Sequence, residues 1–233
     1  MDFSFLSDDR YHLLDAFWMT IQLTFWSAIG AMIFGTILAA MRVSPVPLLR
    51  GFGAAYVNII RNVPLTVVIF MMYFVLFSQL GLRVASREVG VNPQSYIDTT
   101  NFRLAVIGFI IYTSTFVCES IRSGINTVPP GQAEAARAIG LRFTQVLGIV
   151  ILPQAIRSVV APLASVLIAL TKNTTIASAI GVSEAAVLMN TLIENESDKL
   201  IPVFLTIAAG FIILTLPIGL LLGRVAKRVA VKR

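Results

Sequence analysis

Long stretches without a charged side chain restrict this chain to one kind of environment. Residues 17–40, 63–82 and 201–223 contain no Asp, Glu, Lys or Arg, and residues 104–125 carry charges only near their end. A helix that crosses about 30 Å of hydrocarbon needs about 20 apolar residues. Hydrophobic residues make up 57% of the chain and charged residues 13%, about half of the roughly 25% usual in soluble domains. We therefore predict an all-α integral membrane protein.

A further apolar run is interrupted by polar residues, so the span before the last one is harder to define. Residues 159–170 are apolar but too few to span alone, the polar residues 171–175 follow, and residues 176–180 are apolar again. We predict a helix over about residues 153–172, followed by a short segment that packs on the outer side without crossing. The chain then forms a single domain over residues 1–233, with about five spans and with its termini on opposite sides of the membrane.

The distribution of basic residues predicts the orientation, because short cytoplasmic loops carry an excess of Lys and Arg. With five spans, one face collects Arg42, Arg50, Arg122, Arg137, Arg142, Arg157, Arg224, Lys227, Arg228, Lys232 and Arg233. The other face is rich in acids and carries Arg10, Arg83, Arg87, Arg103, Lys199, Asp2, Asp8, Asp9, Asp15, Glu88, Asp98, Glu194, Glu196 and Asp198. We predict that the N-terminus lies outside and the C-terminus lies in the cytoplasm. The net charge of +6 then reflects orientation and not binding of nucleic acid.

Small residues recur every four positions in two of the predicted spans. They are Ser27, Ala31, Gly35 and Ala39 in the first span, and Thr215, Gly219 and Gly223 in the last. Such rows let helix backbones approach closely in lipid, so we interpret them as packing stripes without chemistry. No repeat divides the chain into matching halves, which counts against a secondary transporter built from inverted repeats.

Two single residues exclude several kinds of site. Cys118 is the only cysteine, so no internal disulfide can form, and its apolar surroundings favour a small buried hydrophobic residue. His12 is the only histidine, and alone it builds neither a zinc site nor, without a placed nucleophile, a catalytic triad. We therefore predict no metal site. The acidic N-terminus also lacks the basic start of a cleavable signal peptide.

We predict that the longest cytoplasmic loop, residues 129–153, is a docking element for a partner protein. Its two prolines end the preceding helix, and the alanine-rich residues 132–139 favour a short helix that Gly140 would stop. A second short helix would then lead to Pro153 at the start of the next span. Alanines let the surface of a partner come close, and charged side chains can fix its orientation: Glu134, Arg137 and Arg142.

The same loop resembles the EAA loop of ABC importer permeases. The resemblance rests on Glu134-Ala135-Ala136, Gly140 and Val150-Ile151-Leu152-Pro153 at the spacing of that family, with Val150 where the family prefers isoleucine. In that family the loop is a coupling helix seated in a groove of the ATP-hydrolysing subunit. The resemblance therefore implies the type I ABC importer permease fold and contacts to an ATPase from Glu134, Ala135, Ala136, Arg137, Gly140, Arg142 and Pro153.

Three further segments are similar to permeases for polar amino acids (histidine, glutamine and glutamate). Residues 61–65 resemble their Arg-Gly-Thr-Pro-Leu element, with Asn62-Val63 in place of Gly-Thr. Residues 119–125 match the segment before their EAA loop, and residues 170–178 match their Lys-x-Thr-Ser-Leu element with Thr175-Ile176 for Ser-Leu. The resemblance covers nearly the whole chain.

The likeness is strongest to permease subunits of glutamate uptake systems, in residues 101–106 and 112–117. The sequence does not decide between glutamate, glutamine, aspartate and other polar amino acids. It also leaves open whether the second permease subunit is identical to this chain or a sister chain. The resemblance places the protein in the bacterial plasma (inner) membrane.

The energy for transport must come from another chain, because this one has no G-x-x-x-x-G-K-[ST] phosphate loop. We predict that it is not an enzyme and binds no cofactor, and that ATP and Mg²⁺ are held by a partner ATPase. The resemblance implies ATPase subunits, a second permease subunit and an extracellular or lipid-anchored amino-acid-binding protein as partners. No residue is expected to form a covalent intermediate.

Polar residues inside spans suggest where the substrate passes, since ionisable groups there usually face protein or water. We predict that the pathway is lined by Arg61, Asn62, Glu119, Lys172, Asn173, Thr174 and Thr175. Arg61 or Lys172 would attract a substrate carboxylate. The alternative is that Arg61 and Glu119 form a structural ion pair or lie at an interface, and that Lys172 reaches out to the membrane surface.

Two other functions remain to be compared with the importer. A stand-alone channel or an ion-coupled carrier would transport without ATP, but the odd number of spans and the EAA-like loop oppose it. A structural membrane scaffold would leave the polar residues 172–175 without a purpose.

Overall fold

The computed structural model describes residues 2–82, 84–85 and 92–229, and every regular element in them is helical. The predicted all-α fold is therefore confirmed. Several charges used to predict the orientation lie outside the described residues: Arg83, Arg87, Glu88, Lys232 and Arg233.

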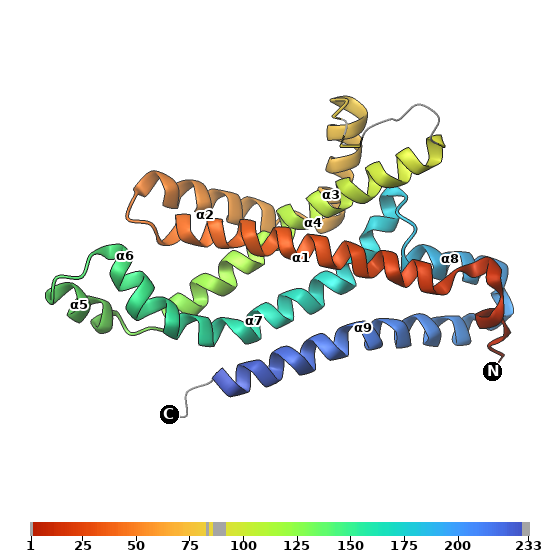
Figure 1. Cartoon of the computed structure of the whole chain (residues 1–233). Helices are drawn as coiled ribbons and strands as arrows, with labels where there is room; N and C mark the ends of the chain where they lie inside the picture. The colour runs from red at the N-terminus through yellow and green to blue at the C-terminus, as the bar shows by residue number, and fades with distance from the viewer. Residues whose placement is uncertain (1, 83, 86–91, 230–233) are drawn as a thin grey trace.

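Four long helices form the body of the molecule. They are α1 (Leu13–Val43), α4 (Pro93–Asn126), α7 (Leu152–Asn173) and α9 (Leu200–Val229), and each belongs to a stretch long and apolar enough to cross a membrane. They lie side by side, α1 against α4, α4 against α7 and α7 against α9 (Figure 1). The two termini lie at opposite ends of this bundle.

Residues 63–82, predicted as the second span, contain a shorter helix that follows a sharp bend. Helix α2 (Pro47–Arg61) runs back along α1, and α3 (Leu65–Phe70) continues into η3 (Met71–Gln79), a π-helix. The two parts meet at a bend of 102°, and they are long enough to cross a membrane only if they count as one broken span. Pro64 explains the bend, because the residue before a proline is disfavoured in helical conformation.

The polar break after residue 170 coincides with a change in the type of helix. The predicted helix over residues 153–172 corresponds to α7, which continues as a 3₁₀ helix, η5 (Thr174–Ile180). Gly181 ends this helix in a left-handed conformation with a φ of 81°. A separate helix, α8 (Ala185–Asn195), then leads to α9.

The small-residue row of the first span is a packing stripe, as predicted. Ser27, Ala31, Gly35 and Ala39 are all buried on the face of α1 that meets α4. A Cβ atom at Gly35 would lie 2.6 Å from Cβ of Val117, so only glycine permits this approach. The row therefore sets how closely α1 and α4 pack.

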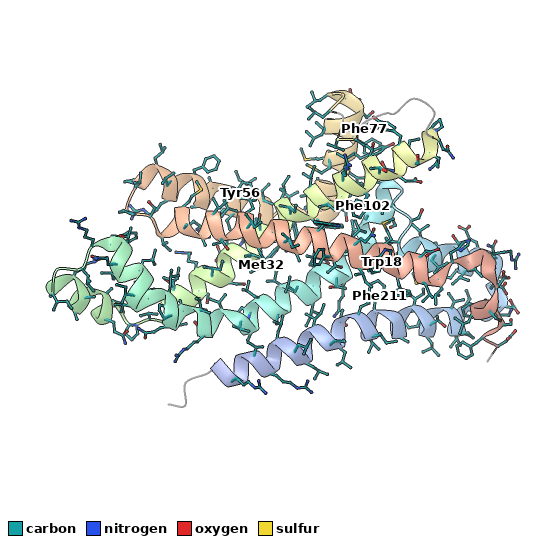
Figure 2. The ribbon with its side chains drawn as sticks, in the orientation of Figure 1. Trp18, Met32, Tyr56, Phe77, Phe102 and Phe211 are labelled. Atoms are coloured by element: carbon teal, nitrogen blue, oxygen red, sulfur yellow. The ribbon has the colours of Figure 1, made fainter. Side chains whose placement is uncertain are left out.

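Large apolar side chains cover the outer surface of the bundle, as expected for a protein whose solvent is lipid. Trp18 on α1 is 58% exposed, and Ile213 on α9 is 70% exposed. Figure 2 shows Trp18 among the side chains that surround the ribbon.

A network of polar side chains ties the N-terminal residues to the start of α9. The short 3₁₀ helices η1 (Ser4–Ser7) and η2 (Asp9–Tyr11) lead into α1, and η6 (Ser197–Lys199) leads into α9. The Tyr11 hydroxyl donates to Oε1 of Glu196 at 3.0 Å, and Lys199 Nζ donates to its Oε2 at 2.7 Å. These partners lower the pKa of Glu196, Lys199 most strongly.

Candidate functional site

The predicted docking loop folds as two short helical segments. Helix α5 (Pro130–Ala138) is followed by Ile139 and then by Gly140, whose φ of 92° places it in the left-handed region. The Gly140 N–H donates to the Arg137 carbonyl at 2.9 Å, and the Leu141 N–H donates to the Ala136 carbonyl at 3.1 Å. Gly140 therefore stops the helix as the sequence predicts, because glycine takes this conformation without steric cost.

One alanine of the loop is buried, and the other residues predicted to contact an ATPase are exposed. Ala136 is only 6% exposed, and α5 rests on η4 (Val146–Ile151), a π-helix. Ile139, at the end of α5, is 82% exposed. The remaining residues predicted to contact an ATPase are all exposed: Glu134, Ala135, Arg137, Gly140, Arg142 and Pro153.

One hydrogen bond connects this loop to the start of α7, and a second lies within the loop. Gln154 Nε2 donates to Oε1 of Gln132 at 2.6 Å, and the Arg142 N–H donates to Oε1 of Gln145 at 2.9 Å at the start of α6 (Phe143–Gln145). The loop lies at the same end of the bundle as the C-terminus (Figure 1). A force on α5 would thus reach α7 directly.

A glycine contact joins α7 to α4 at the same end. A Cβ atom at Gly124 would lie 2.1 Å from Cγ2 of Val159 and 3.0 Å from the Ala155 carbonyl oxygen, so the glycine lets the two helices approach closely at this point. The Ser158 hydroxyl bridges them as well, at 3.3 Å from the Gly124 carbonyl and 3.0 Å from the Thr127 hydroxyl. The loop, α7 and α4 are therefore mechanically connected.

Arg61 and Glu119 lie close together, in the ion-pair arrangement that the sequence left as an alternative. Glu119 Oε1 is paired with the guanidinium of Arg42, and Nη1 of Arg61 lies 3.8 Å from the same oxygen. The side chains of Arg42, Glu119 and Arg61 are 10%, 32% and 45% exposed. Arg42 was not among the predicted pathway residues, because its position at the end of a span suggested a loop charge. The neighbouring Asn62 is exposed, and its Nδ2 donates to the Asn58 carbonyl at 2.6 Å.

In the predicted cluster at residues 172–175, one side chain is exposed, and two others donate hydrogen bonds to backbone carbonyls. Lys172 is exposed, and no ion pair to it occurs in the described part of the chain. The Thr174 side chain is fully buried, and its hydroxyl donates to the Thr171 carbonyl at 2.7 Å. The Thr175 hydroxyl donates to the Lys172 carbonyl at 2.9 Å. The two threonines thus use their donors within their own helix.

Asn173 lines a cavity of about 250 Å³ between α4 and α7. Its polar lining consists of Tyr112, Thr113, Ser165 and Asn173, and Phe116 and Leu170 are among its apolar walls. The sequence singled out residues 112–117 only for their likeness to glutamate permeases. Their role as the wall of a cavity depends on the packing of two helices far apart in the chain, which no local pattern reveals.

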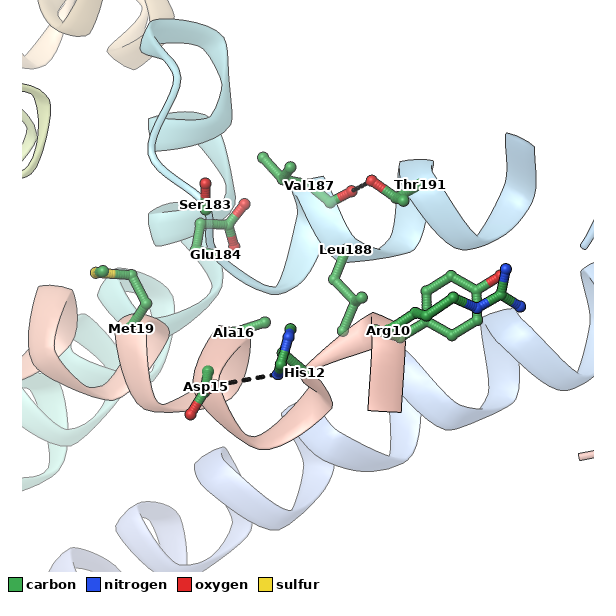
Figure 3. A pocket seen from close by; sticks show the side chains of 11 residues that line it. Arg10, His12, Asp15, Ala16, Met19, Ser183, Glu184, Val187, Leu188 and Thr191 are labelled. Atoms are coloured by element: carbon green, nitrogen blue, oxygen red, sulfur yellow. Dashed lines mark hydrogen bonds and ion pairs between the residues drawn. The ribbon is translucent and has the colours of Figure 1, made fainter. Parts of the chain in front are cut away.

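A second cavity, of about 370 Å³, lies where the start of α1 meets α8 (Figure 3). Glu184 on its wall is fully buried, and its Oε2 accepts the Ala186 N–H at 3.0 Å at the start of α8. Its Oε1 has no hydrogen-bond partner among the described residues. Burial raises the pKa of Glu184 to about 7. Asp15, which also lines the cavity, lies 3.6 Å from Nδ1 of His12.

The described residues hold no group of three or more His, Cys, Asp or Glu side chains that could bind a metal ion. Cys118 is fully buried, as predicted, and lies beside Leu38 and Val57 in the core.

Comparison with known proteins identifies the family. Residues 31–231 match the model of the family described as "Binding-protein-dependent transport system inner membrane component". The chain belongs to this family. It is therefore the membrane-spanning permease component of an ABC importer, and it acts with ATPase subunits and a second permease subunit. The permease itself is not an enzyme, because ATP hydrolysis resides on the separate ATPase subunit.

Several relatives are similar to this permease over nearly its whole length. The glutamate transport system permease protein GluC of Corynebacterium efficiens is 58% identical over 221 residues, which cover 95% of each chain. The probable glutamine ABC transporter permease protein GlnM of Bacillus subtilis is 32% identical over 230 residues, 98% of each chain. A crystal structure of an amino acid ABC transporter with histidines superposes with a TM-score of 0.82 at 26% identity, over 98% of this chain and 99% of the other. The type I permease fold predicted from the sequence is thus confirmed.

Proposed function

We propose that this permease forms the translocation pathway of an ATP-driven importer for glutamate. The observation that carries the proposal is the 58% identity to GluC, named as a glutamate transport permease, over 95% of both chains. A binding protein on the outer side would deliver the amino acid, and a second permease subunit, identical or a sister chain, would complete the pathway.

The orientation proposed from the basic residues has the N-terminus outside and the C-terminus in the cytoplasm. The arrangement of the bundle supports it, because the α5 loop and the C-terminus lie at one end and the N-terminus at the other (Figure 1). The end with the α5 loop and the C-terminus also carries Arg137 and Arg142 on the loop and Arg224 and Arg228 on α9. Such an excess of basic residues is typical of the cytoplasmic side. The exposed loop would then face the compartment that contains ATP.

Coupling to the ATPase would run through the α5 loop. Glu134, Arg137 and Arg142 are free to pair with charges on the partner, and the exposed Ile139 offers an apolar contact. In the proposed cycle the ATPase subunits hold ATP and Mg²⁺, close, and push on α5. The contact of α5 with η4, the Gln132–Gln154 hydrogen bond and the Gly124 contact carry the motion to α7 and α4.

The proposed pathway follows the groove between α4 and α7. Its cavity of about 250 Å³ is large enough for an amino acid and carries four neutral polar side chains, including Asn173. Lys172 and Asn62 are exposed and would reach the pathway only in the assembled dimer. Thr174 and Thr175 would support it indirectly, by holding the helix that carries Asn173.

The test is reconstitution in liposomes with the ATPase, the binding protein and either one or both permease chains. We expect uptake of labelled glutamate that requires ATP and that fails in Glu134→Lys although the variant still inserts. Glu134→Gln, which removes the charge and keeps the shape, is the control and should retain part of the uptake. Uptake by this chain alone and without ATP would instead favour a carrier or channel. ATP-dependent uptake of another amino acid, with glutamate ignored, would refute the proposed substrate and leave the importer intact.

A further inference from the structure

The cavity between α4 and α7 is lined by polar side chains whose hydrogen bonds are not made. Among the described residues, the hydroxyls of Tyr112 and Thr113 and the amide of Asn173 have no hydrogen-bond partner. Thr113 is only 4% exposed. A polar group this far from bulk water is costly to leave without a partner, so the cavity is suited to a ligand that forms hydrogen bonds.

Two aromatic rings form part of the cavity wall. Tyr112 and Phe116 lie one turn apart on α4, and their ring centroids are 5.1 Å apart at an interplanar angle of 57°. The face of an aromatic ring carries partial negative charge, so it attracts a cation and repels an anion. The wall therefore favours the positively charged part of a ligand.

The other polar groups of the cavity are neutral oxygen acceptors. No charged side chain lines the cavity in the part of the chain that the structure describes. The Ser165 hydroxyl donates to the Ala161 carbonyl at 3.4 Å, which leaves its oxygen able to accept a hydrogen bond. Neutral oxygens and aromatic rings bind a primary ammonium group less tightly than a carboxylate does. Weak binding suits a pathway, because a transported group must leave each site again.

We propose that this cavity binds the α-ammonium group of the transported amino acid. Thr113 and Asn173 accept hydrogen bonds from the ammonium group, and the rings of Tyr112 and Phe116 stabilise its charge. The inference rests on the proposed import of an amino acid, and it adds which end of that molecule the pathway recognises.

The proposal predicts which compounds the cavity distinguishes. Glutamate and glutamine carry the same α-ammonium group, so the cavity treats them alike. Glutarate has both carboxylates of glutamate and no ammonium group, so the cavity does not retain it. The cavity thus separates amino acids from dicarboxylates, and the choice among amino acids is made elsewhere.

The experiment places one reactive cysteine in the cavity of the complete permease–ATPase complex in nanodiscs. Ala169 is exposed and lines the cavity, whereas the native Cys118 is fully buried, so Ala169→Cys provides the reactive thiol. Labelling of this chain is measured with aminoethyl methanethiosulfonate, which carries an ammonium group, and with the anionic sulfonatoethyl methanethiosulfonate. Relative to free cysteine in solution, we expect the cavity to favour the ammonium reagent. Glutamate and glutamine should slow the labelling, and glutarate should not.

Two further substitutions, each added to Ala169→Cys, remove parts of the site separately. Thr113→Val keeps the shape and removes the hydroxyl, and Phe116→Leu removes an aromatic ring. Each should raise the glutamate concentration that halves the labelling rate by about three- to tenfold, the worth of one such interaction. Phe116→Leu should also reduce the preference for the ammonium reagent. Thr115→Val is the matched control, because the Thr115 hydroxyl donates to the Tyr112 carbonyl and the side chain does not line the cavity. It should change neither quantity.

Four results would overturn the inference. Equal protection by glutarate would show that the ammonium group is not recognised, and protection that is unchanged in Thr113→Val and Phe116→Leu would remove these residues from the site. Labelling that no amino acid slows would mean that the cavity holds only water, and Ala169→Cys that reacts with neither reagent would mean that it is closed. The reagent preference is measured without substrate, and ATP-dependent glutamate uptake by the wild-type complex is measured in parallel. Failure of the inference is thereby distinguished from failure of the proposed function.

Discussion

Replacing Glu184 with glutamine removes the ionisable carboxyl group of one buried side chain and keeps the size of that side chain. The carboxyl is fully buried, and its Oε2 accepts the Ala186 N–H that begins α8. Glutamine keeps an oxygen that can accept this hydrogen bond, and it removes the ionisation. The variant therefore isolates the energetic effect of the buried charge.

The magnitude follows from the pKa of Glu184, which burial raises from 4.5 to about 7. The folded protein holds this proton more tightly than the unfolded chain does. The resulting stabilisation is complete below about pH 4.5 and is lost as the pH rises to about 7. At 1.36 kcal/mol per pKa unit, the wild type loses roughly 3 kcal/mol over that interval relative to Glu184→Gln. Groups that titrate in both proteins cancel in the comparison.

The assay is thermal unfolding of the detergent-solubilised protein, followed by the fluorescence of Trp18 and Trp26 on α1, at several pH values between 4 and 8. We expect Glu184→Gln to become progressively more stable than the wild type as the pH rises, with the difference levelling off above pH 7. Glu194→Gln, an exposed acid on the same helix, should show no such trend. A difference that does not depend on pH would refute the reasoning. It would mean that the N-terminus of α8 compensates fully for the cost of burying the charge.

Two further substitutions test packing and transport. Gly35→Ala would place a methyl group 2.6 Å from Cβ of Val117 and should reduce the stability by about 1 to 3 kcal/mol in thermal unfolding. Gly51→Ala meets no atom within 4 Å and should leave the stability equal or slightly higher, so equal effects of the two variants would contradict the packing argument. Lys172→Ala should reduce glutamate uptake in liposomes while the complex still assembles. Full uptake with unchanged affinity at normal expression would exclude Lys172 from the pathway.

Hydropathy predicted the long helices well because lipid imposes a simple rule on them. Helices α1, α4 and α9 contain the predicted spans, and each extends beyond them at one or both ends. The small-residue row of α1 was also readable, since close packing in a membrane requires small side chains at a fixed spacing. Both signals are local in sequence, and neither depends on which helices become neighbours.

The bent second span could not be predicted in the same way. Residues 63–82 carry no charge, so they resemble a straight span, and the amphipathic α2 before them resembles a loop because it contains Arg50 and Arg61. The position of α2 depends on contacts such as the Tyr56 hydroxyl, which donates to the Ile111 carbonyl at 3.1 Å. Those residues lie 55 positions apart in the sequence.

In the candidate site, too, the features that depend on consecutive residues were predicted, and those that depend on contacts between distant residues were not. The α5 loop was predicted in detail because its helix former, its stop at Gly140 and its family motif are all consecutive in the chain. The partnership of Arg42 with Glu119 was missed because 77 positions separate them. Glu184 was missed because an acid at a helix start is usually exposed, and only the packing of α1 over α8 buries it.

The 102° bend between α2 and α3 changes the direction of the chain at little cost in backbone hydrogen bonds. The N–H groups of Asn62 and Val63 donate to the Ile59 and Ile60 carbonyls, and the Pro64 carbonyl accepts from the N–H groups of Val67 and Val68. Pro64 itself has no N–H to leave unpaired. A proline at this point therefore allows a sharp turn in surroundings where water cannot satisfy a free backbone group.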